Sequence, residues 1–242
     1  MMNNQEKVFL ENLKTIDVEI SEKQLEQFNS YFEILVEWNK VMNLTGITEY
    51  DEVLLKHFVD SLCFNPNKLI KSDKISLIDV GTGAGFPGLP IKIAYENVDV
   101  VLLDSLNKRI KFLDEVISKL GLKNIKTIHS RAEDGGRNKD LREKFDIAIS
   151  RAVANLSSLA EYNLPYVKVG GYFVAMKSGE IDEEAANAKK AISLLGGEIE
   201  KIEKFQLPNS DIDRSLVIVK KVKATSKKYP RKAGLPTKEP LK

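Results

Sequence analysis

The stretch Leu77–Gly88 reads LIDVGTGAGFPG and places four glycines within eight positions, directly after a short apolar run. Glycine lets the backbone approach a bound nucleotide closely, so a glycine-rich turn from a strand into a helix is typical of a nucleotide-binding loop. Gly83, Gly85 and Gly88 fit the spacing G-x-G-x-x-G. Together with Gly81 the stretch also fits G-x-G-x-G. Such spacings are weak signals alone, and the surrounding elements decide their meaning.

Apolar periodicity predicts alternating strands and helices around this turn. The predicted strands are Ser76–Val80, Asp99–Leu103, Ile125–Ile128, Phe145–Ser150, Gly171–Met176, Glu198–Gln206 and Ser215–Lys221. The predicted helices are 5–14, 21–40, Glu49–Cys63, Leu89–Tyr95, Lys108–Leu120, Leu156–Leu164 and Ile181–Leu195. This order predicts an α/β fold with a mostly parallel sheet, preceded by N-terminal helices. The last two strands, joined by PNSDID, predict an antiparallel hairpin at the sheet edge.

The same pattern divides the chain into three parts: an N-terminal helical layer over residues 1–70, a sheet domain over 71–222 and a basic tail over 223–242. The segment Lys220–Lys242 holds nine basic residues and one acid, which leaves 28 basic and 34 acidic residues in the remainder. The body therefore carries a net charge of −6 and the terminal segment +8. A basic arm of this kind suits a polyanionic partner, although a disordered, solubilising terminus fits the charge equally well.

Composition narrows the class of protein further. The 242 residues contain no run of about 18 apolar side chains, and the N-terminus MMNNQEKVFLENL lacks the apolar region of a secretory signal. Cys63 is the one cysteine, which excludes an intramolecular disulfide and a cysteine-based zinc cluster. Two histidines, His57 and His129, are too few for a metal site. We expect a cytoplasmic monomer without a metal.

Asp104 directly follows the next predicted strand, Asp99–Leu103, and lies 19 residues after Gly85. A carboxylate at this position can accept hydrogen bonds from both hydroxyls of a ribose. NAD and S-adenosylmethionine both fit this arrangement. Pro87 and Pro90 remove N–H donors that a pyrophosphate would use, while Asp79 can face the cationic methionine end of S-adenosylmethionine. The terminal hairpin also favours a methyltransferase fold, so S-adenosylmethionine is the favoured cofactor.

Six separated motifs resemble the RsmG family, also called GidB. The matching runs are EWNKVMNLTGIT with HFVDSL, LIDVGTGAGFPGLPIKI, LLDSLNKRIKFL, HSRAED, FDIAISRAVANL and YPRKAGLPTKEPL. The resemblance covers nearly the whole chain and implies a Rossmann-like, class I S-adenosylmethionine-dependent methyltransferase. It also implies transfer of a methyl group to N7 of a guanosine in the decoding-region loop of 16S ribosomal RNA. The partner would be that RNA or the small ribosomal subunit, assembled or precursor.

The resemblance also implies which residues contact the cofactor. They are Gly81, Gly83, Phe86, Asp104, Ser105, Leu106, Ala132, Glu133 and Arg151. Gly81 and Phe86 are expected at the methionine and sulfonium. Asp104 is expected to hold the ribose, with the two residues after it flanking the adenine. Ala132 and Glu133 are expected to close on the adenine edge.

Arg151 follows the fourth predicted strand, and the resemblance places it near the methyl group and the incoming base. Alternatively, its guanidinium pairs with Asp79 or Asp146, and Glu133 is a solvated loop acid. Guanine N7 has an exposed lone pair, so its methylation needs in-line positioning rather than a general base. We therefore expect no side chain in acid–base catalysis and assign Arg151 to positioning.

Cations that follow the strands, or lie in the tail, are candidates for RNA contacts. They are Lys108, Arg131, Lys177, Arg231 and Lys232, each of which is an ordinary solvated charge in the simplest interpretation. Two other functions remain open at this point. One is an NAD(P)-linked oxidoreductase, although the absence of a Tyr-x-x-x-Lys motif from this sequence argues against it. The other is a non-catalytic ribosome-assembly factor that binds RNA. The intact glycine turn argues against this function, because a protein that only binds RNA would not need it.

Overall fold

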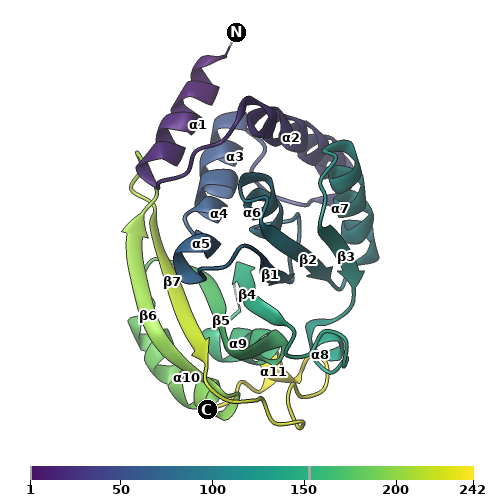
Figure 1. The fold of residues 1–242 in the computed structure, drawn as a ribbon, viewed down its shortest axis with the longest axis vertical. Helices are drawn as coiled ribbons and strands as arrows, with labels where there is room; N and C mark the ends of the chain where they lie inside the picture. Colours follow the sequence, from purple (N-terminus) through teal and green to yellow (C-terminus); the bar gives the residue numbers. More distant parts are fainter. Residues whose placement is uncertain (1, 152–153) are drawn as a thin grey trace.

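A computed structural model describes residues 2–151 and 154–242 of the chain. Ala152 and Val153, within the motif FDIAISRAVANL, lie outside the described residues. The described strands are β1 (Ile75–Val80), β2 (Val98–Asp104), β3 (Ile125–His129), β4 (Phe145–Arg151), β5 (Val167–Ser178), β6 (Gly197–Gln206) and β7 (Asp213–Lys221). They form one sheet with the order β3-β2-β1-β4-β5-β7-β6 (Figure 1).

The sheet has the predicted connectivity. The neighbouring pairs β1–β2, β2–β3, β1–β4 and β4–β5 are parallel, which requires crossover connections between their strands. Strand β7 is antiparallel to both β5 and β6, which makes the terminal hairpin. The strand order reverses direction between β1 and β4, and this is where open parallel sheets bind ligands at their carboxyl ends. The prediction of a mostly parallel sheet with an antiparallel edge hairpin is confirmed.

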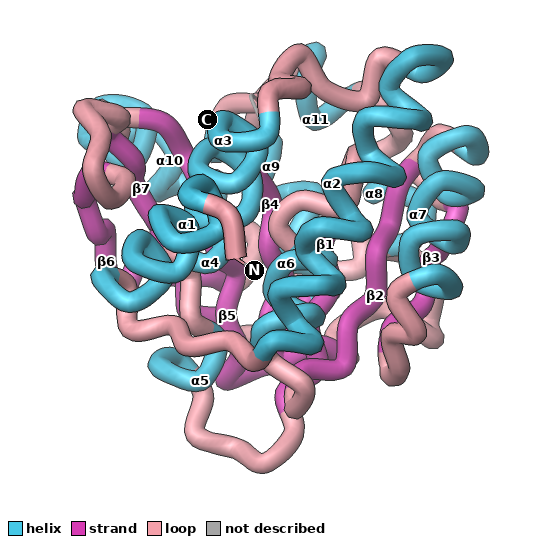
Figure 2. The backbone as a smooth tube through the Cα atoms, turned by 90° about the horizontal axis from the view of Figure 1, so that it is seen from above, coloured by secondary structure: helices cyan, strands magenta, loops and turns pink. Residues whose placement is uncertain are grey.

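Helices cover both faces of the sheet. Their bounds are α1 (Asn4–Thr15), α2 (Glu22–Met42), α3 (Tyr50–Val53), η1 (Leu54–Val59), α4 (Asp60–Leu62), α5 (Pro66–Leu69), α6 (Gly88–Ala94), α7 (Asn107–Lys119), α8 (Ala132–Gly135), α9 (Leu156–Asn163), η2 (Leu164–Tyr166), α10 (Asp182–Leu194) and α11 (Leu235–Lys238). In Figure 2 the N-terminal helices α1 and α2 lie in front of the sheet and α9 lies behind it. None of the described helices is long and apolar enough to cross a membrane.

The protein has two hydrophobic cores, one on each face of the sheet. The first joins the N-terminal helices, α6 and α7 to one face, and its aromatic centre is formed by Phe9, Phe28, Tyr31 and Phe58. The second joins α9 and α10 to the other face. Within this core α2 packs on α6 and α7, and Tyr31 of α2 lies near the rings of Phe86 and Phe112.

The predicted helix Glu49–Cys63 is interrupted in its middle. Segment η1 is a π-helix that lies between the short helices α3 and α4. A π-helix is wider than an α-helix and appears mostly as a single turn within α-helices, frequently at functional sites. The apolar spacing of this region predicts one continuous helix, because the single extra residue of a π-helical turn hardly changes that spacing.

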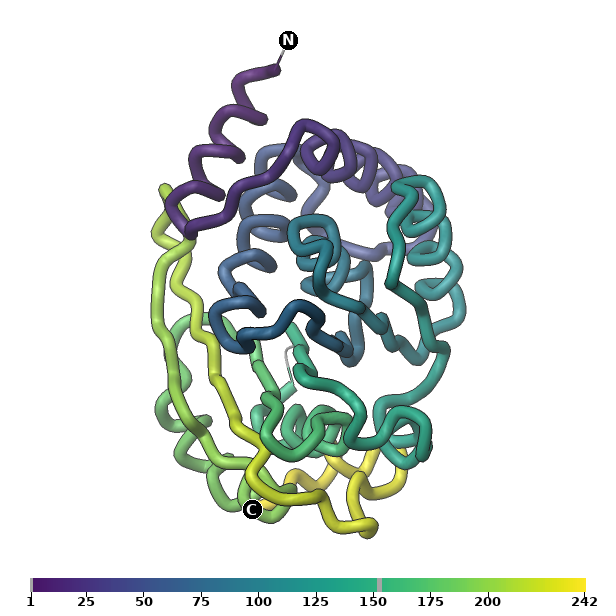
Figure 3. The backbone as a smooth tube through the Cα atoms, viewed as in Figure 1, coloured from purple at the N-terminus to yellow at the C-terminus, as the bar shows by residue number. Residues whose placement is uncertain are grey.

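The terminal segment after Lys221, predicted as a basic arm or a disordered terminus, packs against the body of the protein. It folds back beneath the sheet, where the yellow chain end of Figure 3 passes beside the α8 region. Arg142 donates hydrogen bonds to the carbonyl oxygens of Gly136, Thr225 and Tyr229, which ties the segment to the loop before β4. Buried polar partners, rather than apolar periodicity, fix this part of the chain.

Candidate functional site

A cleft of about 350 Å³ opens at the carboxyl ends of β1, β2 and β4. It lies between the glycine turn after β1 and the helices α8 and α9. Residues that line it include Gly81, Asp104, Arg131, Ala132, Glu133 and Gly234. The sequence places most of these side chains together, because the carboxyl ends of parallel strands meet at one edge of a sheet. Gly234 comes from the C-terminal segment and was not predicted here.

The glycines of the turn divide into two kinds. Gly81 and Gly83 have φ angles of 75° and 61°, and a Cβ built at either position would meet no atom within 4 Å. Gly85 and Gly88 are buried, and a Cβ there would meet the side chains of Leu89 and of Asp79. Gly81 therefore leaves space at the cleft and Gly83 leaves space beside it, whereas the last two allow the turn to pack on the helices and the sheet.

Asp104 lies at the end of β2 and faces the glycine turn. Its side chain is 2% exposed, and its Oδ2 accepts hydrogen bonds from the backbone N–H of Gly83 at 2.9 Å and from Arg109 Nη1 at 3.3 Å. Oδ1 accepts from the N–H of Leu106 at 2.9 Å. The carboxylate is thus fixed in orientation, while Ser105 and Leu106 beside it are exposed.

Asp79 lies under the turn rather than in the cleft. It is fully buried, and its Oδ2 accepts hydrogen bonds from Thr82 Oγ1 at 2.6 Å and from the Gly88 N–H at 2.9 Å. Its Oδ1 has no partner among the described residues. Burial raises the pKa of this carboxyl to about 6. A buried, under-satisfied acid beneath an open turn suits a cationic group bound above it.

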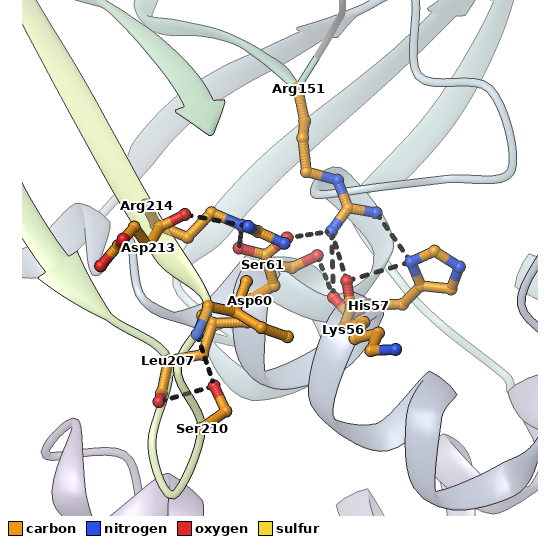
Figure 4. Close-up of polar contacts among 10 residues, drawn as sticks. Lys56, His57, Asp60, Ser61, Arg151, Leu207, Ser210, Asp213 and Arg214 are labelled. Atoms are coloured by element: carbon orange, nitrogen blue, oxygen red, sulfur yellow. Dashed lines mark hydrogen bonds and ion pairs between the residues drawn. The ribbon is translucent and has the colours of Figure 1, made fainter. Parts of the chain in front are cut away.

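Arg151 ends β4 and points toward the N-terminal layer. Its Nη1 lies 3.0 Å from Asp60 Oδ2, and Arg214 Nε on β7 lies 2.9 Å from Asp60 Oδ1 (Figure 4). Arg151 also donates to the carbonyl oxygens of Lys56 and His57 in η1. The suggested partners Asp79 and Asp146 are therefore wrong, and Asp60 holds the guanidinium instead.

His57 is a packed, neutral side chain. Its Nε2 lies 2.8 Å from Thr45 Oγ1, and its ring stacks on Phe86 with 4.5 Å between centroids. Burial, and secondarily the positive charge of Arg151, lower the pKa of His57 to about 4. Phe86 is buried against this ring and beneath the Arg151 guanidinium, whose Cζ lies 4.9 Å from its centroid.

A second cleft of about 690 Å³ adjoins the first and shares Arg109 with it. Cationic side chains dominate its lining: Lys56, Arg109, Arg151, Lys177 and Arg214, with the single carboxylate of Asp60. Even with His57 neutral, the five cations outnumber the single carboxylate, so the lining carries a net positive charge. Sequence reasoning missed Asp60, Arg109 and Arg214. The HFVDSL motif contains Asp60, but no local pattern connects it to a strand end.

The predicted RNA contacts fall into two groups. Lys108, Arg131 and Lys232 are exposed. Lys177 lies 2.9 Å from Glu184 and donates to the Ala154 carbonyl, and its side chain is 10% exposed. Arg231 pairs with the fully buried Glu161 at 2.7 Å. The last two cations are therefore engaged inside the fold. The described residues contain no cluster able to hold a metal ion.

The sheet order, the terminal hairpin and the acid facing a glycine turn define the class I S-adenosylmethionine-dependent methyltransferase fold. Among solved structures, M. jannaschii TYW2 in complex with AdoMet has a TM-score of 0.50 and 14% identity, covering 62% of this chain and 71% of its own. MtNAS in complex with MTA and tNA has a TM-score of 0.54 and 14% identity, covering 84% and 71%. At these identities the likeness concerns the fold alone.

The family follows from the sequence comparisons. Residues 24–217 match GidB, described as rRNA small subunit methyltransferase G, and the chain belongs to this family. A ribosomal RNA small subunit methyltransferase G from Lachnoclostridium phytofermentans is 54% identical, over 96% of each chain. One of the same name from Clostridium novyi is 51% identical, over 98% of this chain and 99% of its own. The resemblance seen in the motifs is confirmed.

Proposed function

We propose that this protein transfers the methyl group of S-adenosylmethionine to N7 of a guanosine in 16S ribosomal RNA. The observation that carries the proposal is that the open glycine Gly81 and the carboxylate of Asp104 line one cleft, with that carboxylate fixed by the backbone N–H of Gly83. Family membership supports the reaction and the RNA substrate. It also argues against an oxidoreductase and against a factor that only binds RNA.

The proposed cofactor contacts involve residues that can accept further hydrogen bonds. The ionised Asp104 carboxylate has about four lone-pair sites, and three donors use it. It can therefore accept from ribose hydroxyls while it still holds the glycine turn. We assign the adenine to the side of the cleft formed by Ala132 and Glu133, flanked by Ser105 and the exposed Leu106.

The chemistry requires positioning from the protein. S-adenosylmethionine supplies an electrophilic methyl group on a sulfonium, and guanine N7 needs no proton removed before it attacks. His57 is neutral and buried, with Thr45 at one ring nitrogen and Arg151 3.3 Å from the other. It is not placed as a base. Arg151, held by Asp60, is proposed to orient the acceptor nucleotide at the mouth of the cofactor cleft.

The cationic second cleft is proposed to receive the RNA. Its volume lies within the range of small-ligand pockets, and its guanidinium groups can donate to phosphate and to base acceptors. The exposed Lys108, Arg131 and Lys232 are proposed to contact neighbouring phosphates. Lys177 and Arg231 are assigned to ion pairs within the fold. A monomer in the cytoplasm remains our expectation.

The test is methyl transfer by the purified protein to 16S RNA and to small subunits from a strain that lacks the gene. Labelled S-adenosylmethionine and base-resolved mapping should locate one N7-methylguanosine in the decoding-region loop. Asp104→Ala, checked for folding, serves as the control for a damaged cofactor cleft. Label on another base, or no transfer to either substrate by the folded protein, would contradict the proposal. NADH in place of S-adenosylmethionine should leave the melting temperature unchanged.

A further inference from the structure

The C-terminal segment reaches the rim of the cofactor cleft. The backbone N–H of Gly234 donates to Glu133 Oε1 at 2.7 Å, and both residues line that cleft. Glu133 is 6% exposed, and its Oε2 has no hydrogen-bond partner among the described residues. One carboxylate oxygen is thus held by the terminal segment, while the other is free to accept from a ligand.

The segment is held on α9 by a buried ion pair. Glu161 is fully buried and receives two hydrogen bonds from Arg231 Nε and one from Nη2, as well as one from the Arg231 backbone N–H. Ser158 Oγ donates to the Pro236 carbonyl at 2.7 Å, and Tyr162 bonds Thr237. A buried carboxylate needs such a partner, so the position of Arg231 is strongly specified.

Helix α8 depends on the same segment. It has only four residues and no side-chain cap, so it has no stability of its own. On one side Tyr166 donates to the Ala132 carbonyl at 2.6 Å. On the other side Pro230 packs so closely that a Cβ on Gly136 would lie 3.2 Å from its Cγ. Glu133 therefore takes its position from contacts on both sides of α8, one of which is the terminal segment.

We infer that the segment Tyr229–Lys238 forms the outer wall of the cofactor cleft and that the Arg231–Glu161 ion pair positions Glu133 to accept a hydrogen bond from the adenine amine. This inference rests on the proposed function for the location of the adenine. It makes Arg231 a positioning residue for cofactor binding and replaces its expected role as an RNA contact. The positive charge of Arg231 is neutralised by a buried acid, which a phosphate contact would have to displace.

The discriminating probe is a ligand that differs only at the adenine amine. In the 6-deamino (purine) analogue of S-adenosylhomocysteine a hydrogen atom replaces the amine, so the donor to the carboxylate is lost while the ring nitrogens remain acceptors. Wild-type protein should prefer S-adenosylhomocysteine by roughly 10- to 100-fold in calorimetry, the range of one hydrogen bond to a charged group. Arg231→Gln should reduce this preference below about threefold, with little change in affinity for the purine analogue.

Lys238→Gln is the matched control, because it removes one exposed cation from the same segment. It should keep the wild-type preference. If Arg231→Gln does not fold, the paired Glu161→Gln and Arg231→Gln variant removes both charges and should show the same loss. A folded variant of either kind that retains the preference would overturn the inference, as would a wild-type protein that binds both ligands equally. Failure of wild type to bind S-adenosylhomocysteine at all would instead refute the proposed function.

Discussion

Replacing Gly81 by alanine tests the proposed cofactor cleft, and Gly121→Ala serves as the matched control. Gly81 and Gly121 share a left-handed backbone, with φ of 75° and 62°, and at both positions a Cβ would meet no atom within 4 Å. Gly121 lies after α7, outside both clefts. The two substitutions therefore carry the same backbone penalty and differ only in what the new methyl group faces.

The backbone penalty of an L-residue in this conformation is roughly 1–2 kcal/mol. For a chain of this size it corresponds to a fall in melting temperature of about 2–8 °C in either variant. Only Gly81→Ala should also weaken S-adenosylmethionine binding, by about tenfold or more, because its methyl group projects into the cleft. The cost in binding free energy would be at least about 1.4 kcal/mol.

Calorimetric titration of both variants, after a thermal melt shows that each is folded, separates the two effects. Gly81→Ala with the affinity of Gly121→Ala would refute the assignment, because a ligand that lies along the turn cannot ignore a methyl group placed there. Equal losses in both variants would point to general destabilisation and would refute it as well.

Three further predictions follow from the site. Asp104→Ala should weaken S-adenosylmethionine binding by roughly 1.5–3 kcal/mol, measured by titration, as expected for lost hydrogen bonds to a charged group. Asp60→Asn leaves Arg151 and Arg214 without their shared carboxylate and should lower the unfolding free energy by about 3–5 kcal/mol in denaturant melts. Because the pKa of His57 is lowered from 6.5 to about 4, the unfolded chain binds the proton more readily. Wild-type stability should therefore fall as pH drops from about 6.5 to 4, and the fall should be smaller in His57→Gln.

The sheet could be predicted from the sequence because its signals are local. Strand β1 was expected at Ser76–Val80 and begins one residue earlier, and the terminal hairpin was expected within about two residues of its bounds. The meeting of Asp104 with the glycine turn follows from parallel strands that end at one edge. Each of these inferences needs only apolar spacing, turn residues and the rules of sheet topology.

The terminal segment could not be predicted in the same way. Its many lysines and prolines resemble a disordered tail, since few apolar residues are available to anchor it. Its anchors are acids and an arginine that lie 70 to 101 residues away, such as Glu161 and Glu133. No spacing rule connects residues so distant. Because the distant acid could not be foreseen, the charge asymmetry of the chain suggested a basic arm that binds RNA, although Arg231 forms an ion pair with Glu161 inside the fold.

The acceptor side of the site depends on residues that precede the sheet. The glycine turn, Asp104 and α8 surround the cofactor cleft, but the arginine that ends β4 is held by Asp60 and by carbonyl oxygens of η1, all from the N-terminal layer. The π-helix directs two of its carbonyl oxygens to this side chain. Without that layer Arg151 would lose its anionic partner and the carbonyls that orient it. Under the proposed function, the helical layer therefore contributes to the side of the site that receives the acceptor, although it precedes the sheet in the chain.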